Sequence, residues 1–348
     1  MENSDKQTDI YLRIIQKLIR LVIVLSIILI LLPIVFLNLD TISNFFKEDE
    51  AKVVPYTEEK TAVAINDDTF WAPRDLEYIT NDKKLDKVLY GKDLIEHTSK
   101  YFGPKGSINS LSNGLNCQNC HLSSGTKVFG NNYGSVASTY PKMRARSGKI
   151  ESMKKRINDC FERSLNGKAI DEYGKEMKAI VAYMNHLGKN VPKGKKAEGS
   201  GLKDMAFINR AANPDQGKLV YDTKCASCHA PNGEGIPNPD GTEFTYPPLW
   251  GTNSFNDAAG LYRISNMAKF VKYNMPFGIS HDAPQLTDEE SWDVAAYIIS
   301  QPRPHKKVPT DWPDISKKPI DHPFGPYADK FTEEMHKFGP FTEMKVKN

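Results

Sequence analysis

Residues 117–121 read Cys-Gln-Asn-Cys-His and residues 225–229 read Cys-Ala-Ser-Cys-His, so one motif with C-x-x-C-H spacing occurs twice. Two thiols one helical turn apart can bond the two vinyl groups of a haem, while the histidine that follows reaches the iron. One motif could also be a zinc or redox pair, but two copies in similar surroundings favour two covalently bound c-type haems. The predicted haem-binding residues are Cys117, Cys120, His121, Cys225, Cys228 and His229. The histidine of each motif is the expected proximal ligand of the iron.

The segments around the two motifs look like diverged copies of one unit. A Gly-Lys pair precedes each motif, at 91–92 in the first segment and at 217–218 in the second. An Ala-Tyr pair marks the helical segment that closes each copy, at 182–183 and 296–297. The order of helix, motif, loop and closing helix resembles the small all-α cytochrome c fold, and alternating strand patterns are scarce.

The N-terminal region is predicted to cross a membrane once. From Leu21 to Leu37 only Ser26 and Pro33 interrupt the apolar run, and a helix of about 20 residues spans a ~30 Å hydrocarbon layer. Basic residues precede the run and acidic residues follow it, which places the rest of the chain on the periplasmic side of the inner membrane. A cleaved signal peptide is the alternative, although the run is longer than a usual signal sequence and no A-x-A-like site follows it.

Composition and low-complexity stretches indicate how the chain is divided. Its 348 residues are enough for about two domains, and 39% hydrophobic with 26% charged residues is typical of globular proteins. The net charge of +3 does not indicate nucleic acid as a partner. A stretch rich in Gly, Lys and Ser from Gly188 to Gly201 is typical of a linker. The tail after Gln301 is rich in proline and aromatic residues, and we expect it to lie across the domains in extended form.

The expected fold class is all-α, with two cytochrome c-type domains in tandem after an N-terminal transmembrane helix. The expected segments are a membrane anchor (1–40), a tether (41–75), a first cytochrome c domain with the active-site haem (76–190), a linker (191–204), a second cytochrome c domain with an electron-transfer haem (205–300) and an extended tail packed on the domains (301–348).

Met275 is the predicted distal ligand of the second haem. It lies in the segment KYNMPFG, where Pro276 restrains the backbone beside the thioether. Met267 has a helical setting and is expected in the hydrophobic core instead. Ligation by histidine and methionine raises the reduction potential, which suits the haem from which electrons leave.

The first copy has no Met-Pro loop, and Cys160 lies in the corresponding interval. Met177 and Met184 are on the closing helix, where a packing role is the default. A buried free cysteine that acts as a small hydrophobic residue is the alternative for Cys160. The cationic neighbours of Cys160 are Lys154, Lys155, Arg156 and Arg163. Because cations favour the thiolate that binds ferric iron, Cys160 is the predicted distal ligand of the first haem.

Three arginines indicate an anionic substrate. Arg144 and Arg146 lie in YPKMRARSG, and Arg156 follows shortly before Cys160. A forked guanidinium suits oxyanions such as sulfur oxoacids. A solvated basic face, or arginines paired with haem propionates, are the alternatives.

With these motifs the sequence resembles the TsdA-type thiosulfate dehydrogenases, a dihaem cytochrome c family, from about residue 70 to the end. The matching segments are NCQNCH, YPKMRARSG, RINDCFERSLNG, KYNMPFG and HPFGPYADKF. The resemblance implies an enzyme that joins two thiosulfates into tetrathionate and releases two electrons; some relatives run in reverse as tetrathionate reductases. It also implies that Cys160 and Met275 are the distal ligands of the two haems. Asn274 stands where some relatives carry lysine, so a switch to lysine ligation is not expected.

The resemblance also suggests how the residues act. Arg144, Arg146 and Arg156 are expected to gather thiosulfate, and the Cys160 sulfur to bond transiently to its sulfane sulfur. Electrons would leave to a periplasmic cytochrome c or a membrane-bound terminal oxidase. The main rival is a membrane-anchored dihaem electron carrier without substrate chemistry of its own. A sulfur-carrying cytochrome and a dihaem peroxidase are further rivals, and the histidines available to a peroxidase are His97, His186 and His281.

Overall fold

The structure is a computed structural model that describes residues 18–22, 25–26, 62–63 and 70–346. The chain divides into two compact units, residues 1–54 and 55–348. In the first unit the described residues are helical, and the predicted membrane span from Leu21 to Leu37 lies largely outside them. None of the helices in the part of the chain that the structure describes could span a lipid bilayer. The predicted tether 41–75 also lies mostly outside the described residues.

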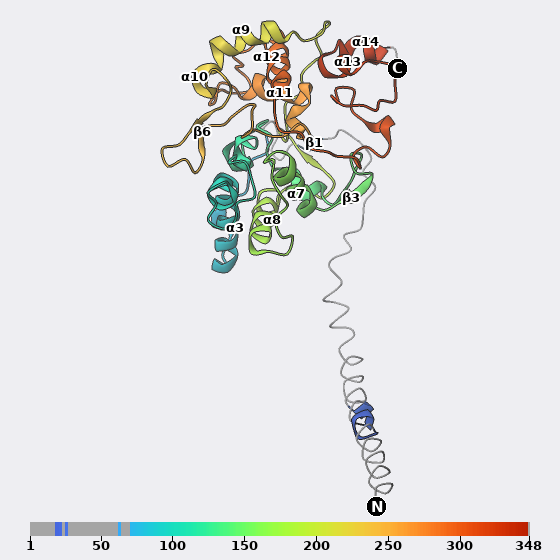
Figure 1. Cartoon of the computed structure of the whole chain (residues 1–348). Coiled ribbons are helices and arrows are strands. Elements are labelled where there is room, and N and C mark those ends of the chain that lie inside the picture. Colours follow the sequence, from blue (N-terminus) through green and yellow to red (C-terminus); the bar gives the residue numbers. More distant parts are fainter. Residues whose placement is uncertain (1–17, 23–24, 27–61, 64–69, 347–348) are drawn as a thin grey trace, which may run out of the picture. The chain divides into compact units, whose positions relative to one another are not determined.

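The first half of the second unit is a helical domain around the first motif (Figure 1). Its helices are η1 (Leu76–Tyr78), α3 (Asp82–Glu96), α4 (Thr98–Phe102), η2 (Cys117–Asn119), α5 (Leu122–Gly125), α6 (Val136–Thr139), α7 (Met153–Arg163) and α8 (Lys175–Leu187). Asn81 caps α3 by accepting a hydrogen bond from the Lys84 backbone nitrogen at 2.9 Å. Ser152 caps α7 in the same way. The core of this domain includes Leu94, Phe161 and Ile180, each at most 1% exposed.

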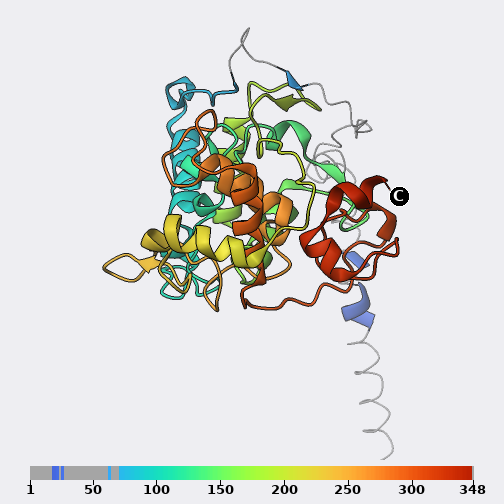
Figure 2. The same ribbon diagram turned by 90° about the horizontal axis from the view of Figure 1, so that it is seen from above.

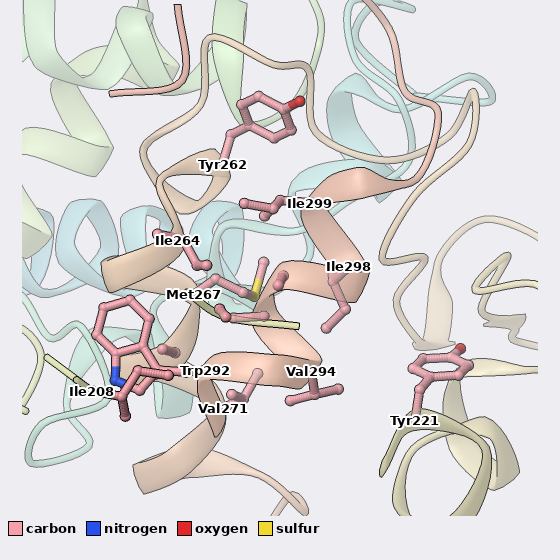
Figure 3. Close-up of a cluster of buried hydrophobic side chains, with 14 of the residues drawn as sticks. Ile208, Tyr221, Tyr262, Ile264, Met267, Val271, Trp292, Val294, Ile298 and Ile299 are labelled. Atoms are coloured by element: carbon pink, nitrogen blue, oxygen red, sulfur yellow. The ribbon is translucent and has the colours of Figure 1, made fainter. Parts of the chain in front are cut away.

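The second domain repeats this plan with its own core. Its helices are α9 (Pro214–Lys224), α10 (Ala226–His229), η3 (Gly260–Tyr262), α11 (Ile264–Asn274) and α12 (Asp288–Ser300). Thr287 and Glu290 form a capping box that starts α12. Figure 3 shows Met267 inside the core between Ile264 and Trp292, and only 3% of Met267 is exposed. The prediction that Met267 is a core residue is therefore confirmed.

In each domain, the glycine of the Gly-Lys pair lies against the tyrosine of the Ala-Tyr pair. A Cβ atom placed on Gly91 of α3 would lie 2.0 Å from the carbonyl oxygen of Ala179 and 2.9 Å from Cβ of Tyr183. A Cβ atom on Gly217 of α9 would lie 1.9 Å from the carbonyl oxygen of Asp293 and 2.9 Å from Cβ of Tyr297. Each glycine thus lets the helix that carries it, α3 or α9, touch the backbone of the closing helix of the same domain. The same kind of helix crossing therefore occurs once in each domain.

Three short strand pairs accompany the helices in the described part of the chain. They are β1 (Ala62–Val63) with β4 (Lys196–Ala197), parallel, β2 (Lys142–Arg144) with β3 (Lys149–Glu151), antiparallel, and β5 (Ile236–Pro237) with β6 (Phe244–Tyr246), antiparallel. The fold is helix-rich, as expected from the sequence. The strands were not expected, because two or three residues are too few to show an alternating pattern.

The C-terminal tail corrects one expectation. An extended tail was predicted, but it contains η4 (Ile315–Lys317), α13 (Glu333–Phe338) and α14 (Phe341–Val346), drawn in red in Figures 1 and 2. Thr332 caps α13 by accepting a hydrogen bond from the Met335 backbone nitrogen. Phe341 and Met344 are at most 2% exposed and complete the core of the second domain. Burying these two side chains on one face favours a helical turn there over an extended chain.

Candidate active site

The first motif presents a histidine that is prepared to bind a metal. His121 donates its Nδ1 hydrogen to the carbonyl oxygen of Asn131 at 2.5 Å, which leaves Nε2 free as a ligand. Burial lowers the pKa of His121 to about 4, so the imidazole is neutral, as a ligand must be. The ring of Tyr133 stacks on the imidazole with 4.5 Å between centroids.

The haem-binding residues of the first motif, Cys117, Cys120 and His121, line one cavity together with Cys160. The cavity holds about 1000 Å³ of space not filled by protein atoms, part of it open to solvent, and its walls are mainly apolar. Burial there raises the pKa of both the Cys117 and Cys120 thiols to about 12. Two thiols, a neutral imidazole and an apolar chamber are what a covalently bound haem requires, so the residues fit this cofactor.

Helix α7 brings Arg156 to Cys160. The two residues are one turn apart on the helix, and Nη1 of Arg156 donates to Sγ of Cys160 at 3.1 Å. The electrostatic interaction with Cys160 is the largest cause that raises the pKa of Arg156 above its usual range. Both side chains line the cavity of the first motif.

The other two predicted arginines lie beside the cavity and not on its lining. Arg144 is on β2, with Nε 3.8 Å from a carboxylate oxygen of the buried Glu151. Nε of Arg146 is 3.9 Å from a carboxylate oxygen of Asp311, and its guanidinium is 5.8 Å from the centre of the Trp312 ring. Burial and the neighbouring cations lower the pKa of Arg146 to about 10. Of the three arginines, only Arg156 reaches Cys160.

The C-terminal tail adds residues to this site that sequence reasoning missed. Asp311 accepts two hydrogen bonds from Arg163, at 2.7 and 2.8 Å, and so is joined to the helix of Cys160. The Trp312 backbone nitrogen donates to the carbonyl oxygen of Arg146 at 2.6 Å. Nothing near position 311 in the sequence signals this contact, because it joins segments about 150 residues apart.

The second motif has the same arrangement of its histidine. His229 donates from Nδ1 to the carbonyl oxygen of Pro247 at 2.8 Å, which again leaves Nε2 free, and burial lowers its pKa. Met275 follows the last residue of α11, and Met275 and Cys225 pack against the same core. The neighbouring Asn274 is fully buried and donates from Nδ2 to the carbonyl oxygen of Phe129 in the first domain at 3.1 Å.

The remaining candidates of the sequence have other partners. Met177 and Met184 are buried in the first core, and Met184 also lines the cavity. His97 contacts the carboxylate of Glu243, and His186 bonds the carbonyl oxygen of Arg74 at 2.8 Å. His281 packs its ring against Phe129. These contacts give the three histidines of the peroxidase hypothesis other roles.

Comparisons with known proteins identify two cytochrome c domains in this chain. The family model described as "SoxA/TsdA, cytochrome c domain" matches residues 109–192, and the model "Cytochrome c" matches residues 214–302. Each of the two domains therefore carries one covalently bound haem.

Curated relatives and a solved structure extend the comparison. The thiosulfate dehydrogenase of Psychrobacter arcticus is 39% identical over 239 residues, which are 68% of this chain and 69% of that protein. The thiosulfate dehydrogenase of Allochromatium vinosum is 36% identical over 58% of this chain and 74% of that protein. The solved thiosulfate dehydrogenase (TsdBA) of Marichromatium purpuratum matches 68% of this chain with a TM-score of 0.63 and 28% identity, and the match spans 50% of that chain. The present chain therefore belongs to the thiosulfate dehydrogenase family.

Proposed function

We propose that this protein is a thiosulfate dehydrogenase that joins two thiosulfate ions into one tetrathionate and releases two electrons. The observation that carries the proposal is the cavity in which Cys160, with Arg156 on its sulfur, lies with the haem-binding residues of the first motif. A cytochrome that only carries electrons has no need of a reactive thiol next to a cation at this place. The family membership supports the same substrate.

The arginines bind and orient the substrate. Thiosulfate carries two negative charges, and two such ions repel each other when they approach. Arg156 at the cavity and Arg144 and Arg146 beside it supply positive charge that offsets this repulsion. Arg156 also donates to the sulfur of Cys160, the atom that forms the bond to the substrate.

The sulfur chemistry balances with Cys160 as a covalent carrier. The Cys160 thiolate and the sulfane sulfur of one thiosulfate form a sulfur–sulfur bond, with the loss of two electrons. The second thiosulfate attacks the sulfane sulfur of this adduct, so that tetrathionate leaves and the thiolate is restored. When bound, the two haems supply the one-electron redox chemistry that takes up the two electrons. In this proposal Cys160 would also bind the iron of the first haem, and Met275 that of the second.

The N-terminal segment belongs to the proposal as a membrane anchor. Its apolar run, with basic residues before and acidic residues after, supports a single span of the inner membrane with both domains on the periplasmic side. Electrons then pass to a periplasmic cytochrome c or a membrane-bound terminal oxidase. Full-length protein should stay with the membrane fraction after a high-salt wash and be digested by protease added to spheroplasts. Release by salt would contradict the anchor.

The proposed activity can be tested directly. The full-length, haem-loaded protein is mixed with thiosulfate and ferricyanide, and tetrathionate and ferrocyanide are both measured. We expect one tetrathionate for every two thiosulfates and two ferrocyanides, and the reverse reaction with tetrathionate and a reductant. No reaction in either direction from fully haem-loaded protein, together with ordinary histidine–methionine spectra for both haems, would identify an electron carrier instead.

A further inference from the structure

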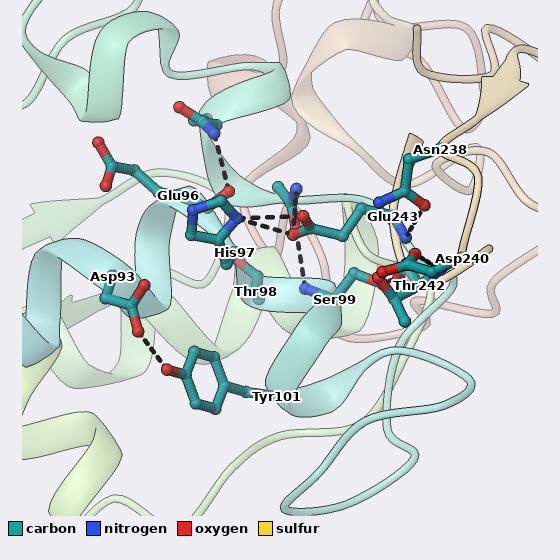
Figure 4. A network of polar contacts seen from close by, with 12 residues as sticks. Asp93, Glu96, His97, Thr98, Ser99, Tyr101, Asn238, Asp240, Thr242 and Glu243 are labelled. Atoms are coloured by element: carbon teal, nitrogen blue, oxygen red, sulfur yellow. Dashed lines mark hydrogen bonds and ion pairs between the residues drawn. The ribbon is translucent and has the colours of Figure 1, made fainter. Parts of the chain in front are cut away.

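A carboxylate of the second domain reaches into the first domain beside its haem motif. Glu243 directly precedes β6, in the hairpin β5–β6 (Figure 4). Both of its carboxylate oxygens lie 3.1 Å from Nδ1 of His97, and one of them accepts a hydrogen bond from Nδ2 of Asn116 at 3.0 Å. The side chain of Glu243 is only 16% exposed, so these hydrogen-bond partners replace most of the water around its carboxylate.

The first-domain end of this contact is tied to the start of the first haem motif. Asn116 is 5% exposed and directly precedes Cys117. The Asn116 Oδ1 atom accepts from the Ser99 backbone nitrogen at 2.8 Å, and the Ser99 hydroxyl donates to the carbonyl oxygen of Thr242 at 2.5 Å. The tip of the hairpin therefore holds the segment that presents Cys117.

The second-domain end is tied to the other haem motif. Only three residues separate Glu243 from Pro247, whose carbonyl oxygen accepts from Nδ1 of the proximal His229. The hairpin is closed by two hydrogen bonds of 3.0 Å between Asn238 and Glu243, one to the Asn238 side chain and one between backbones. One short segment thus contacts the beginning of the first motif and the proximal histidine of the second.

We propose that Glu243 is a positioning residue that fixes the two haem-binding motifs relative to each other and thereby sets the rate of electron transfer between the domains. The inference rests on the proposed function, in which electrons released in the first domain leave through the second. Electron tunnelling slows steeply with distance, so a small displacement of one motif changes the rate. A hydrogen-bonded carboxylate holds such a distance more tightly than apolar contact alone, because its bonds are directional.

The test compares Glu243→Gln with Glu234→Gln in the full-length, haem-loaded protein. Glu234 is an exposed carboxylate of the same loop, which makes it a matched control for the lost charge. Electrons are injected by a photoreductant, and the transfer between the haems is followed by absorbance, so this readout does not require thiosulfate turnover. Hydrogen–deuterium exchange of residues 236–247 is measured on the same samples as a second, haem-independent readout.

For Glu243→Gln we expect inter-haem transfer to slow roughly tenfold and exchange in the hairpin to rise by a similar factor, because a charge-assisted contact is lost. The rate at which the photoreductant reduces each haem should be the same as in wild type. In Glu234→Gln, both inter-haem transfer and exchange should also match wild type. Unchanged transfer and exchange in Glu243→Gln would overturn the inference. If the wild type makes no tetrathionate but Glu243→Gln still shows these effects relative to it, the proposed function is refuted and the positioning role stands.

His97→Asn removes the same contact by changing its more exposed partner. It provides a second test in case Glu243→Gln does not fold. The His97 side chain is 41% exposed, so this change is the milder one for folding. It should slow the transfer in the same direction, and the double variant with Glu243→Gln should be no slower than Glu243→Gln alone. Independent, multiplying effects of the two substitutions would contradict a shared contact.

Discussion

At the scale of single residues, the site depends on a cation one helical turn from a thiol. Arg156 donates to Sγ of Cys160 at 3.1 Å, and both line the cavity of the first haem motif. The spacing alone predicts that they share a face of α7. The sequence could not predict that Arg144 and Arg146 lie beside the cavity and do not line it. Their positions depend on how β2 and the C-terminal tail pack next to the cavity.

Replacing Arg156 with Gln should lower kcat/KM for thiosulfate by about 100-fold or more, because both the thiolate and the approaching dianion lose their nearest cation. The measurement is steady-state oxidation of thiosulfate at matched haem content. Lys154→Gln is the control, since Lys154 lies on the same helix and is directed at the ring of Tyr173, 5.1 Å away. Equal losses in the two variants would show that only the general charge of the helix matters.

Met267 on α11 and Met275 directly after it should respond differently to replacement by alanine. Met267→Ala removes a side chain that is 3% exposed and should cost about 2–5 kcal/mol of unfolding free energy, without altering the spectrum of the second haem. Met275→Ala should alter that spectrum by removing the proposed ligand. Denaturant unfolding and visible spectroscopy on both variants separate these outcomes, and a normal histidine–methionine spectrum in Met275→Ala would contradict the assignment.

At the scale of elements, the shared feature of the two domains is a helix crossing with no room for a side chain. Gly217→Ala would place Cβ 1.9 Å from the carbonyl oxygen of Asp293, so α9 and α12 must separate. We expect a loss of about 1–3 kcal/mol of unfolding free energy, measured by chemical denaturation. Gly260→Ala is the control, because nothing lies within 4 Å of its added Cβ. If Gly217→Ala is as stable as this control, the crossing is not as tight as described.

The helices that cross could be predicted from the sequence, but other elements could not. The Gly-Lys and Ala-Tyr pairs mark the helices that meet, and the position of Met267 on a helix places it in the core. The hairpin β5–β6 and the terminal helices could not be predicted in the same way. The hairpin strands have two and three residues, and α14 is stabilised by burying Phe341 and Met344 in a core that lies far from it in the sequence.

At the scale of the whole molecule, the C-terminal tail forms ion pairs with both domains, through Asp311 to Arg163 and through Asp321 to Arg263, and it contains a neutral histidine, His322. Nε1 of Trp312 donates to Nε2 of His322 at 3.0 Å, which requires that nitrogen to be unprotonated. Burial, followed by the charge of Lys318, lowers the pKa of His322 to about 4. Asp311, next to Trp312, is paired with Arg163 of the first domain. The packing of the tail should therefore depend on pH, because the hydrogen bond between Trp312 and His322 requires a neutral His322.

His322 should make the protein less stable in acid. Its pKa is about 4 when folded and about 6.5 when unfolded, so between these values the unfolded chain binds more protons. Its contribution is complete above about pH 6.5 and is lost as the pH falls toward 4. Thermal unfolding from pH 4 to 8 should show a smaller slope in His322→Gln, whose amide oxygen can still accept from Trp312. Identical slopes in the two proteins would contradict this role.

The role of Cys160 is tested most directly by comparing wild type with Cys160→Ala as full-length proteins of equal haem content. Tetrathionate formed from thiosulfate and the spectrum of the first haem are measured on the same samples. We expect Cys160→Ala to lose at least about 1000-fold in turnover and its first haem to change ligation, because in the proposed function one sulfur serves as both nucleophile and ligand. Wild-type turnover in Cys160→Ala would rule out this role of Cys160.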